Sequence, residues 1–164
     1  MASRLKISGI VMDSIVDGPG LRMAVFTQGC PHRCPGCHNP ESHDPDGGRW
    51  MDVSEIARMV NPLISGVTLT GGEPLEQAGA CLALIDALPE GLSVWVYSGY
   101  TYEEIMRGGT EEQRALIGVA DVLVDGRFLE EKRTLALAFR GSGNQRVIDL
   151  GETRREGEVV VFSV

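Results

Sequence analysis

The amino-acid sequence predicts an α/β fold, a partial and open (β/α) barrel formed as a single domain over residues 1–164. Strand-like and helical segments alternate along most of the chain, which is typical of parallel βαβ units with right-handed crossovers. A chain of 164 residues is too short for a complete eight-unit barrel, which needs roughly 250 residues. No repeat, low-complexity tract or linker divides the chain. The length therefore leaves an open barrel or a related α/β sheet.

The strands are predicted from runs of β-branched, aromatic and aliphatic residues that are bounded by turn-forming residues. The first two are separated by Asp17-Gly18-Pro19-Gly20, whose composition marks a turn or loop. The strands are expected at residues 4–12, 21–27, 67–70, 92–97 and 121–125, with further β-prone segments near 145–149 and 159–163.

The helices are predicted from apolar residues that recur every three or four positions. Asp52 with Glu55, and Thr101 with Glu104, have the spacing of capping boxes at two helix starts. The helices are expected over residues 53–60, 78–88 and, in pieces, from 101 to about 117. Chemistry in such folds collects at the C-terminal ends of the strands, so the loops after the strands at 21–27 and 67–70 are the candidate site.

Composition and charge exclude several classes of function. Hydrophobic residues make up 43% and charged residues 23%, as in an ordinary folded protein. The net charge of −8 argues against nucleic acid or an anionic membrane as a partner. The apolar runs are much shorter than the roughly 20 residues of a spanning helix, and the N-terminus lacks a signal-peptide hydrophobic region. We expect a cytoplasmic protein, whose cysteines favour metal binding or catalysis over disulfides.

Three of the four cysteines lie within eight residues, directly after the strand at 21–27. Cys30, Cys34 and Cys37 have the spacing C-x3-C-x2-C, which lets several thiolates converge on one metal centre. Three thiolates that hold a 4Fe-4S cluster leave one iron open for another ligand. The spacing favours such a cluster over zinc.

A zinc site is the alternative, and a structural zinc site needs a fourth protein ligand. His32, His38 or Cys81 would have to supply it. Cys81 lies in the apolar pattern of the helix at 78–88, where a buried free cysteine behaves as a small hydrophobe. A non-catalytic zinc-binding interaction module stays open on these residues alone.

A second distinctive loop, Gly71-Gly72-Glu73-Pro74, follows the strand at 67–70. Taken alone, it is a strand-to-helix connection. Its glycines permit close backbone approach to a ligand, and the carboxylate of Glu73 would complement a cationic group. Pro74 would stiffen the exit of the loop.

Together, the two loops resemble those of the radical S-adenosylmethionine enzymes. The resemblance implies a 4Fe-4S cluster held by Cys30, Cys34 and Cys37, with an open iron that chelates S-adenosylmethionine. It also implies that the Gly-Gly-Glu-Pro loop binds the amino group of this cofactor. Much of the superfamily has an aromatic residue where this chain has Gly36, so contact with adenine would come from backbone or from His38. The implied cofactor-binding residues are Gly36, Cys37, His38, Gly71, Gly72, Glu73 and Pro74.

The segment at 16–22 is similar to one found in activators of glycyl-radical enzymes, and four further segments resemble the activating proteins of anaerobic ribonucleoside-triphosphate reductase, a family of such activases. These segments span residues 16–22, 34–39, 95–100, 121–128 and 139–146. The resemblance implies that a reduced cluster gives one electron to S-adenosylmethionine, which releases methionine and a 5′-deoxyadenosyl radical. This radical would remove hydrogen from a glycine Cα in the catalytic subunit of the reductase. A one-electron donor such as flavodoxin is the other implied partner.

Two related functions stay open beside this one, namely activation of another glycyl-radical enzyme and radical chemistry on a small molecule. Several polar residues are weighed as structural. Tyr97 and Tyr100 are expected mainly to pack, and Arg140 and Arg146 to be solvated. His32 and His43 are expected to be loop histidines and not ligands. The acidic pairs at 103–104, 111–112 and 130–131 are expected at exposed faces or helix starts.

Overall fold

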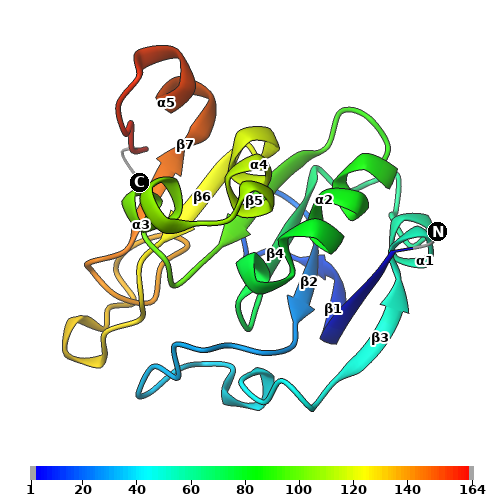
Figure 1. Ribbon diagram of the computed structural model, residues 1–164, viewed down its shortest axis with the longest axis horizontal. Coiled ribbons are helices and arrows are strands. Elements are labelled where there is room, and N and C mark those ends of the chain that lie inside the picture. Colours follow the sequence, from blue (N-terminus) through cyan, green and yellow to red (C-terminus); the bar gives the residue numbers. More distant parts are fainter. Residues whose placement is uncertain (1–2, 163–164) are drawn as a thin grey trace.

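A mixed seven-stranded sheet organises the computed structural model, which describes residues 3–162 (Figure 1). Its strand order is β3-β1-β2-β4-β5-β6-β7. The four central strands β2, β4, β5 and β6 are parallel, whereas β1, β3 and β7 pair antiparallel at the two sides. The strands are β1 Arg4–Ser14, β2 Arg22–Thr27, β3 Arg49–Asp52, β4 Gly66–Gly71, β5 Ser93–Tyr97, β6 Val122–Asp125 and β7 Arg146–Asp149. This open α/β sheet with a parallel centre confirms the predicted fold class.

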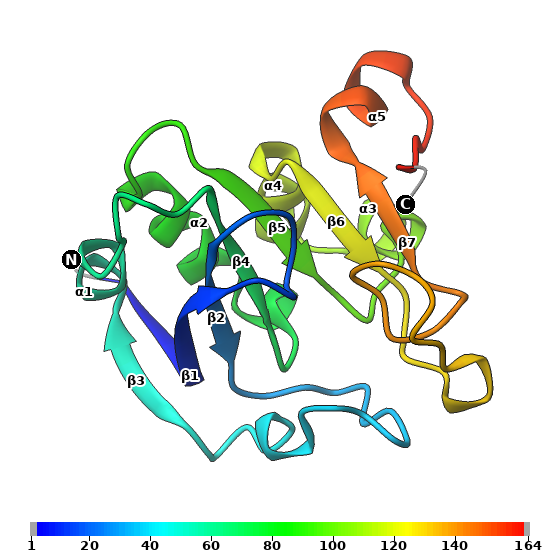
Figure 2. The same cartoon turned by 180° about the vertical axis from the view of Figure 1, so that it is seen from behind.

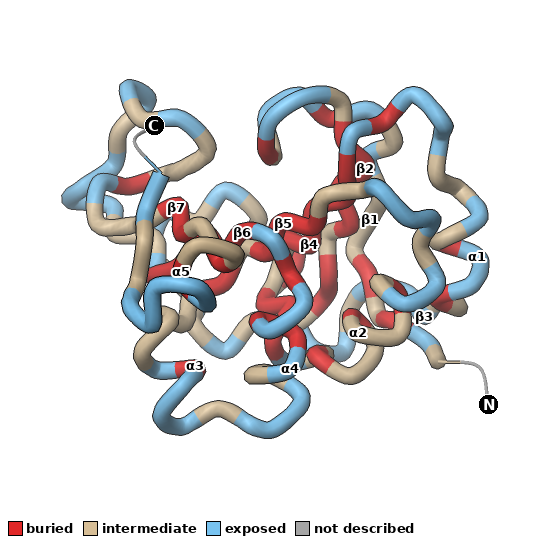
Figure 3. Tube along the Cα trace, turned by 90° about the horizontal axis from the view of Figure 1, so that it is seen from above, coloured by how far each residue is buried: buried red, intermediate tan, exposed pale blue. Residues whose placement is uncertain are grey.

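All helices except α5 lie in the connections between the parallel strands, and α1, α2 and α4 lie on one face of the sheet (Figure 3). The helices are α1 Val53–Arg58, α2 Ala78–Ala87, α3 Tyr102–Gly108, α4 Glu111–Val119 and α5 Leu150–Glu156, with short 3-10 turns at Pro40–Ser42, Pro74–Gln77 and Glu130–Lys132. The core lies between these helices and the central strands, and it includes Cys81, which is fully buried as predicted. Among residues 3–162, no helix has the length and apolarity to span a membrane.

Of the two predicted capping boxes, one is confirmed and the other is wrong. Thr101 and Glu104 form the expected capping box, because Thr101 Oγ1 accepts from the Glu104 amide (3.1 Å) and Glu104 Oε1 accepts from the Thr101 amide (3.0 Å). The box predicted at Asp52 is wrong, since the Asp52 side chain makes no capping hydrogen bond. Asp52 is also the last residue of β3, and its backbone pairs with that of Arg4.

The two ends of the sheet also differ from the prediction. Strand β3 was not predicted, and it gives the sheet an antiparallel edge beside β1 (Figure 2). Helix α5 was not predicted either; Asp149 caps its start and Gly157 ends it in the left-handed conformation at φ 76°. The β-prone segment at 159–163 forms only one isolated bridge, between Val161 and Ile148, and residue 163 lies outside the described residues.

Candidate functional site

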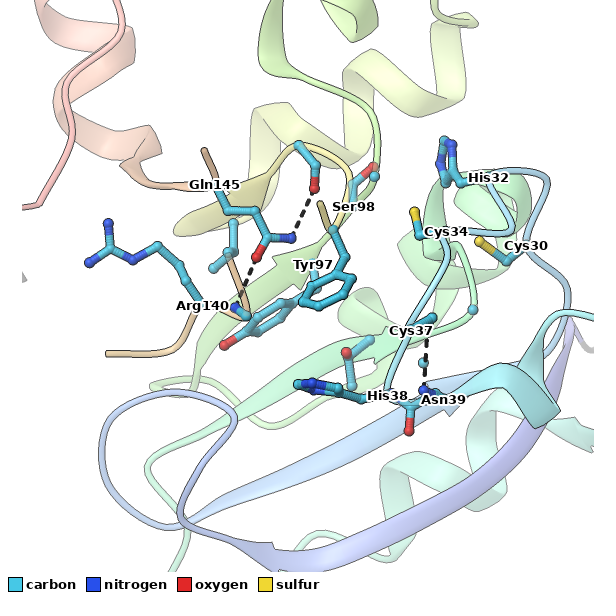
Figure 4. Close-up of a pocket in the computed structure, with 18 of the residues that line it drawn as sticks. Cys30, His32, Cys34, Cys37, His38, Asn39, Tyr97, Ser98, Arg140 and Gln145 are labelled. Atoms are coloured by element: carbon cyan, nitrogen blue, oxygen red, sulfur yellow. Dashed lines mark hydrogen bonds between the residues drawn. The ribbon is translucent and has the colours of Figure 1, made fainter. Parts of the chain in front are cut away.

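A cavity of about 370 Å³ lies where the parallel strands end (Figure 4). The ends of β4, β5 and β6 contribute Gly71, Tyr97 and Val124 to its wall. The predicted cysteine loop closes another side with Cys30, Cys34 and Cys37, and the volume falls within the roughly 300–1,000 Å³ of small-molecule sites. The structure therefore brings both distinctive loops of the sequence to one cavity.

Backbone hydrogen bonds hold the cysteine loop at its base. The Gly29 amide donates to the carbonyl of Ser42 (2.6 Å), and the Cys30 amide donates to that of His43 (3.1 Å). Within the loop, the Cys37 amide donates to the Cys34 carbonyl (3.2 Å). Burial raises the pKa of the Cys30 and Cys37 thiols, so these two cysteines favour the protonated form until a metal displaces the proton.

The three thiols are half-buried and open into the same cavity. In the part of the chain that the structure describes, no group of three His, Cys, Asp or Glu side chains is arranged to hold a single metal ion. A structural zinc ion needs four ligands at about 2.0–2.3 Å from one point, whereas the thiolates of a 4Fe-4S cluster bind different irons. Three thiols on one cavity are the donor set of a cluster with one open iron, and a zinc site would need a fourth protein ligand beside them.

Gly71 and Gly72 both line the cavity, and the backbone around them explains why glycine stands there. Gly71 has φ +94°, and a Cβ on it would lie 2.6 Å from the amide nitrogen of Thr27. A Cβ on Gly72 would lie 2.5 Å from the carbonyl oxygen of Gly29. The two glycines therefore let this loop pack directly against β2 and the start of the cysteine loop.

Glu73 is completely buried and does not line the cavity. Its carboxylate accepts hydrogen bonds from the Leu75 amide (3.1 Å), from the Gly99 amide (2.8 Å) and from Ser98 Oγ (2.9 and 3.0 Å). It also accepts from His32 Nε2 at 2.6 Å. Pro74 is buried behind it as the first residue of a 3-10 turn. The contact of Glu73 and Pro74 with a cofactor stays a prediction.

The other side of the cavity is formed by the loop between β6 and β7. His38 packs on Phe128, with ring centroids 5.3 Å apart, and Gly36 lies against the side chain of Glu130. Gln145 shapes this loop, since its Oε1 accepts from the amides of Gly141 (2.9 Å) and Ser142 (3.1 Å). Gln145 belongs to the segment at 139–146 that the sequence singled out, but no sequence pattern indicated this role.

Some of the residues that were expected to have a structural role line the cavity, and others lie outside it. Tyr97 and Arg140 both line the cavity, and burial raises the pKa of the Tyr97 hydroxyl. Arg146 was expected to be a solvated surface residue, but two carboxylates pair with it. Its guanidinium lies 2.5 Å from Asp125 and 2.6 Å from Glu103, so it joins the end of β6 to α3. Glu103 lies in the first turn of α3, in agreement with the predicted helix start.

Two further residues, Arg22 within the sheet and His43 at the cavity, have buried polar groups that no sequence pattern indicated. Arg22 is fully buried and donates from all three guanidinium nitrogens, to Thr68 Oγ1 (2.8 Å) and to carbonyls of Val67 and Ser93 among others. His43 also lines the cavity, and its Nε2 is buried with no hydrogen-bond partner among residues 3–162. No signal in the sequence marks a histidine whose ring nitrogen is left unpaired.

Comparison with known proteins gives a consistent result. Residues 16–148 match the family model described as a 4Fe-4S single cluster domain. A protein of Salmonella typhi named anaerobic ribonucleoside-triphosphate reductase-activating protein is 35% identical over 144 residues, which cover 81% of this chain and 91% of that protein. Proteins of the same name are 32% identical in Escherichia coli K12 (81% and 91% covered) and 31% in Enterobacteria phage T4 (80% and 86% covered).

Proposed function

The chain belongs to the 4Fe-4S single-cluster family together with the anaerobic ribonucleoside-triphosphate reductase-activating proteins, and from this membership we infer that it is a radical S-adenosylmethionine enzyme that activates such a reductase. The observation that carries the inference is the placement of all three loop cysteines on one cavity with Gly71 and Gly72. The matched region contains both of these loops.

Cys30, Cys34 and Cys37 would hold the cluster, and their half-buried thiols suit a group that is partly exposed to a second ligand. The buried Nε2 of His43 supports the fit, because an unpaired polar atom costs free energy unless a bound group satisfies it. When bound and reduced, such a cluster supplies one electron to the sulfonium of S-adenosylmethionine, whose cleavage gives methionine and the 5′-deoxyadenosyl radical that takes hydrogen from glycine.

The chain's own residues would bind and orient S-adenosylmethionine beside the cysteines. Gly71 and Gly72 line the cavity, as do His38 and Phe128, whose rings contact each other. Tyr97 also lines the cavity. None of these side chains needs to act as an acid or a base, because the cofactor carries the difficult chemistry and the protein excludes side reactions.

The substrate proposed for this site is the catalytic subunit of an anaerobic ribonucleoside-triphosphate reductase. The open sheet supports a protein substrate, since the cavity is not closed by a full ring of strands. The electron would come from a one-electron carrier such as flavodoxin, and the protein would act in the cytoplasm. The electron donor rests on the family resemblance and the location on the sequence alone, and both stay predictions.

The decisive experiment is anaerobic reconstitution with iron and sulfide, followed by reduction with dithionite and addition of S-adenosylmethionine. We expect a 4Fe-4S cluster by absorbance and iron analysis, and 5′-deoxyadenosine as a product. Retention of stoichiometric zinc with no cluster would overturn the enzyme assignment.

A second step tests the partner. Incubation of the loaded protein with the anaerobic reductase from the same organism should give a glycyl radical signal in electron paramagnetic resonance. A protein that forms 5′-deoxyadenosine but gives no radical on a competent reductase would instead activate another glycyl-radical enzyme or act on a small molecule.

A further inference from the structure

The carboxylate of Glu73 is shared by three segments of the chain that are distant in sequence. It accepts from Leu75 within its own loop, from Ser98 and Gly99 at the end of β5, and from His32 in the middle of the cysteine loop. Every one of these partners is a hydrogen-bond donor, and Glu73 itself is completely buried. An ionised carboxylate in this position has its acceptor sites occupied by protein.

Several neighbouring residues enclose the ring of His32 beside Glu73. Its side chain is only 5% exposed, and it makes an edge-to-face contact with Tyr100 at 4.5 Å between ring centroids. A Cβ on Gly99 would come within 2.6 Å of His32 Nε2, so glycine at this position makes the room that the ring needs. This degree of fit is unusual for a residue expected to be an ordinary loop histidine.

We propose that His32 and Glu73 form a clamp that positions the cysteine loop on the strand ends, with His32 and Glu73 acting as positioning residues for the cluster. The proposal rests on the function inferred above, because it assumes that the loop holds a cluster. It gives the Glu73 carboxylate a partner within the protein in place of the cofactor's amino group. His32 lies between Cys30 and Cys34, so the clamp fixes the half of the loop that carries these two cysteines.

The geometry indicates why such a clamp is needed. The loop is held at its base by backbone hydrogen bonds of Gly29 and Cys30, and farther along by the bond from Cys37 to Cys34. Within the loop, the Cys30 sulfur also bonds to the backbone of His32 and Arg33. The stretch between these two anchors contains Arg33 with a positive φ of 48°, a conformation that a non-glycine residue keeps only when its surroundings hold it. The bond from His32 to Glu73 lies in this stretch and joins it to the sheet.

The test compares His32→Leu, Glu73→Ala, the double variant and Gly99→Ala. Hydrogen exchange of the metal-free protein is measured on peptides that span the cysteine loop, and iron is measured after reconstitution and gel filtration. We expect at least tenfold faster exchange in the loop and loss of more than half of the bound iron in His32→Leu. The double variant should be no worse than the more affected single variant, because both substitutions remove the same contact.

Gly99→Ala tests the clamp without substituting either partner, because its added methyl group would displace the ring of His32. It should reproduce the phenotype of His32→Leu. Gly108→Ala is the matched control, because a Cβ there meets nothing within 4 Å. If Glu73→Ala fails to fold, His32→Leu and Gly99→Ala still decide the question, because both residues line the cavity and neither belongs to the hydrophobic core.

Affinity for S-adenosylmethionine, measured on the fraction that retains a cluster, separates the two roles of Glu73. The clamp predicts a change of less than twofold for His32→Leu and for Glu73→Gln in that fraction. A tenfold weaker affinity in Glu73→Gln, with exchange and iron content unchanged in His32→Leu, would overturn the clamp and restore the ammonium contact. A wild-type protein that takes up no cluster would refute the proposed function, whereas exchange in the metal-free chain would still test the clamp.

Discussion

The backbone amide of Cys30 donates a hydrogen bond to the carbonyl oxygen of His43, at 3.1 Å. These two residues also line both the main cavity and a second cavity of about 380 Å³ beside Trp50. His43 therefore stands directly behind the first cysteine, with its Nε2 buried and without a partner among the described residues. In the tautomer that carries its proton on Nε2, this ring can donate a hydrogen bond to a cluster held by the loop.

Replacement of His43 by leucine should have opposite effects on the metal-free and the loaded protein. Without metal, the variant loses a buried unpaired polar atom, so the free energy of unfolding should rise by about 1 kcal/mol. With a cluster bound, the variant loses a hydrogen-bond donor, and the reduction potential should become more negative. Urea unfolding and anaerobic spectroelectrochemistry measure the two quantities.

His43→Gln is the control, because glutamine keeps an N–H donor on the side chain. It should retain more of the wild-type potential than His43→Leu does. Equal potentials in wild type and His43→Leu would show that the ring of His43 makes no contact with the cluster.

Cys37 and Cys81 provide a matched pair of substitutions. Cys37→Ala removes a thiol that opens into the cavity, so cluster content and 5′-deoxyadenosine formation should both be lost. Cys81→Ala removes a thiol from the core between α2 and the sheet, so both should be largely retained. Iron analysis and product chromatography on the two variants check this. Loss of the cluster in Cys81→Ala, with folding intact by circular dichroism, would contradict the assignment of three ligands.

The sequence allowed the prediction of those features that depend on local pattern. The spacing of Cys30, Cys34 and Cys37 located the cluster loop, and the apolar periodicity around Cys81 placed that residue in the core. The capping box at Thr101 was equally local, since it depends on two residues three positions apart. The parallel direction of the central strands followed from the alternation of elements.

What could not be predicted depends on contacts between distant segments. His32 and Glu73 are 41 residues apart, and neither residue type indicates that one would accept the other's hydrogen bond. Strand β3 is short and exposed, so its pairing with β1 leaves no alternating pattern in the sequence. Asp52 had the right spacing for a capping box but was already committed to this strand, and tertiary pairing decided its conformation.

Arg22 should be among the residues on which the stability of the fold most depends. It is fully buried beneath the loop that joins β1 to β2, and its guanidinium donates to groups on β4 and β5. Arg22→Met would keep the apolar stem but leave several buried acceptors without donors, which should lower the free energy of unfolding by about 3 kcal/mol. Urea unfolding measures this loss, and Arg155→Met on exposed α5 should leave the midpoint unchanged. A midpoint for Arg22→Met equal to that of the wild type would mean that water replaces the lost donors.

The stability of the metal-free protein should decrease at alkaline pH in a way that depends on Cys81. Burial raises the pKa of this thiol from 9.0 to about 12, so between these values the unfolded chain loses a proton that the folded chain keeps. Stability therefore falls as pH rises, by up to about 1.4 kcal/mol per pH unit for this one group. Other groups titrate in the same range, so the measured quantity is the difference between wild type and Cys81→Ala in anaerobic urea unfolding. That difference should be constant from about pH 7 to 8 and should shift against the wild type above about pH 9. A difference that stays flat to about pH 10.5 would show that the folded protein lets the Cys81 thiol ionise at its ordinary pKa.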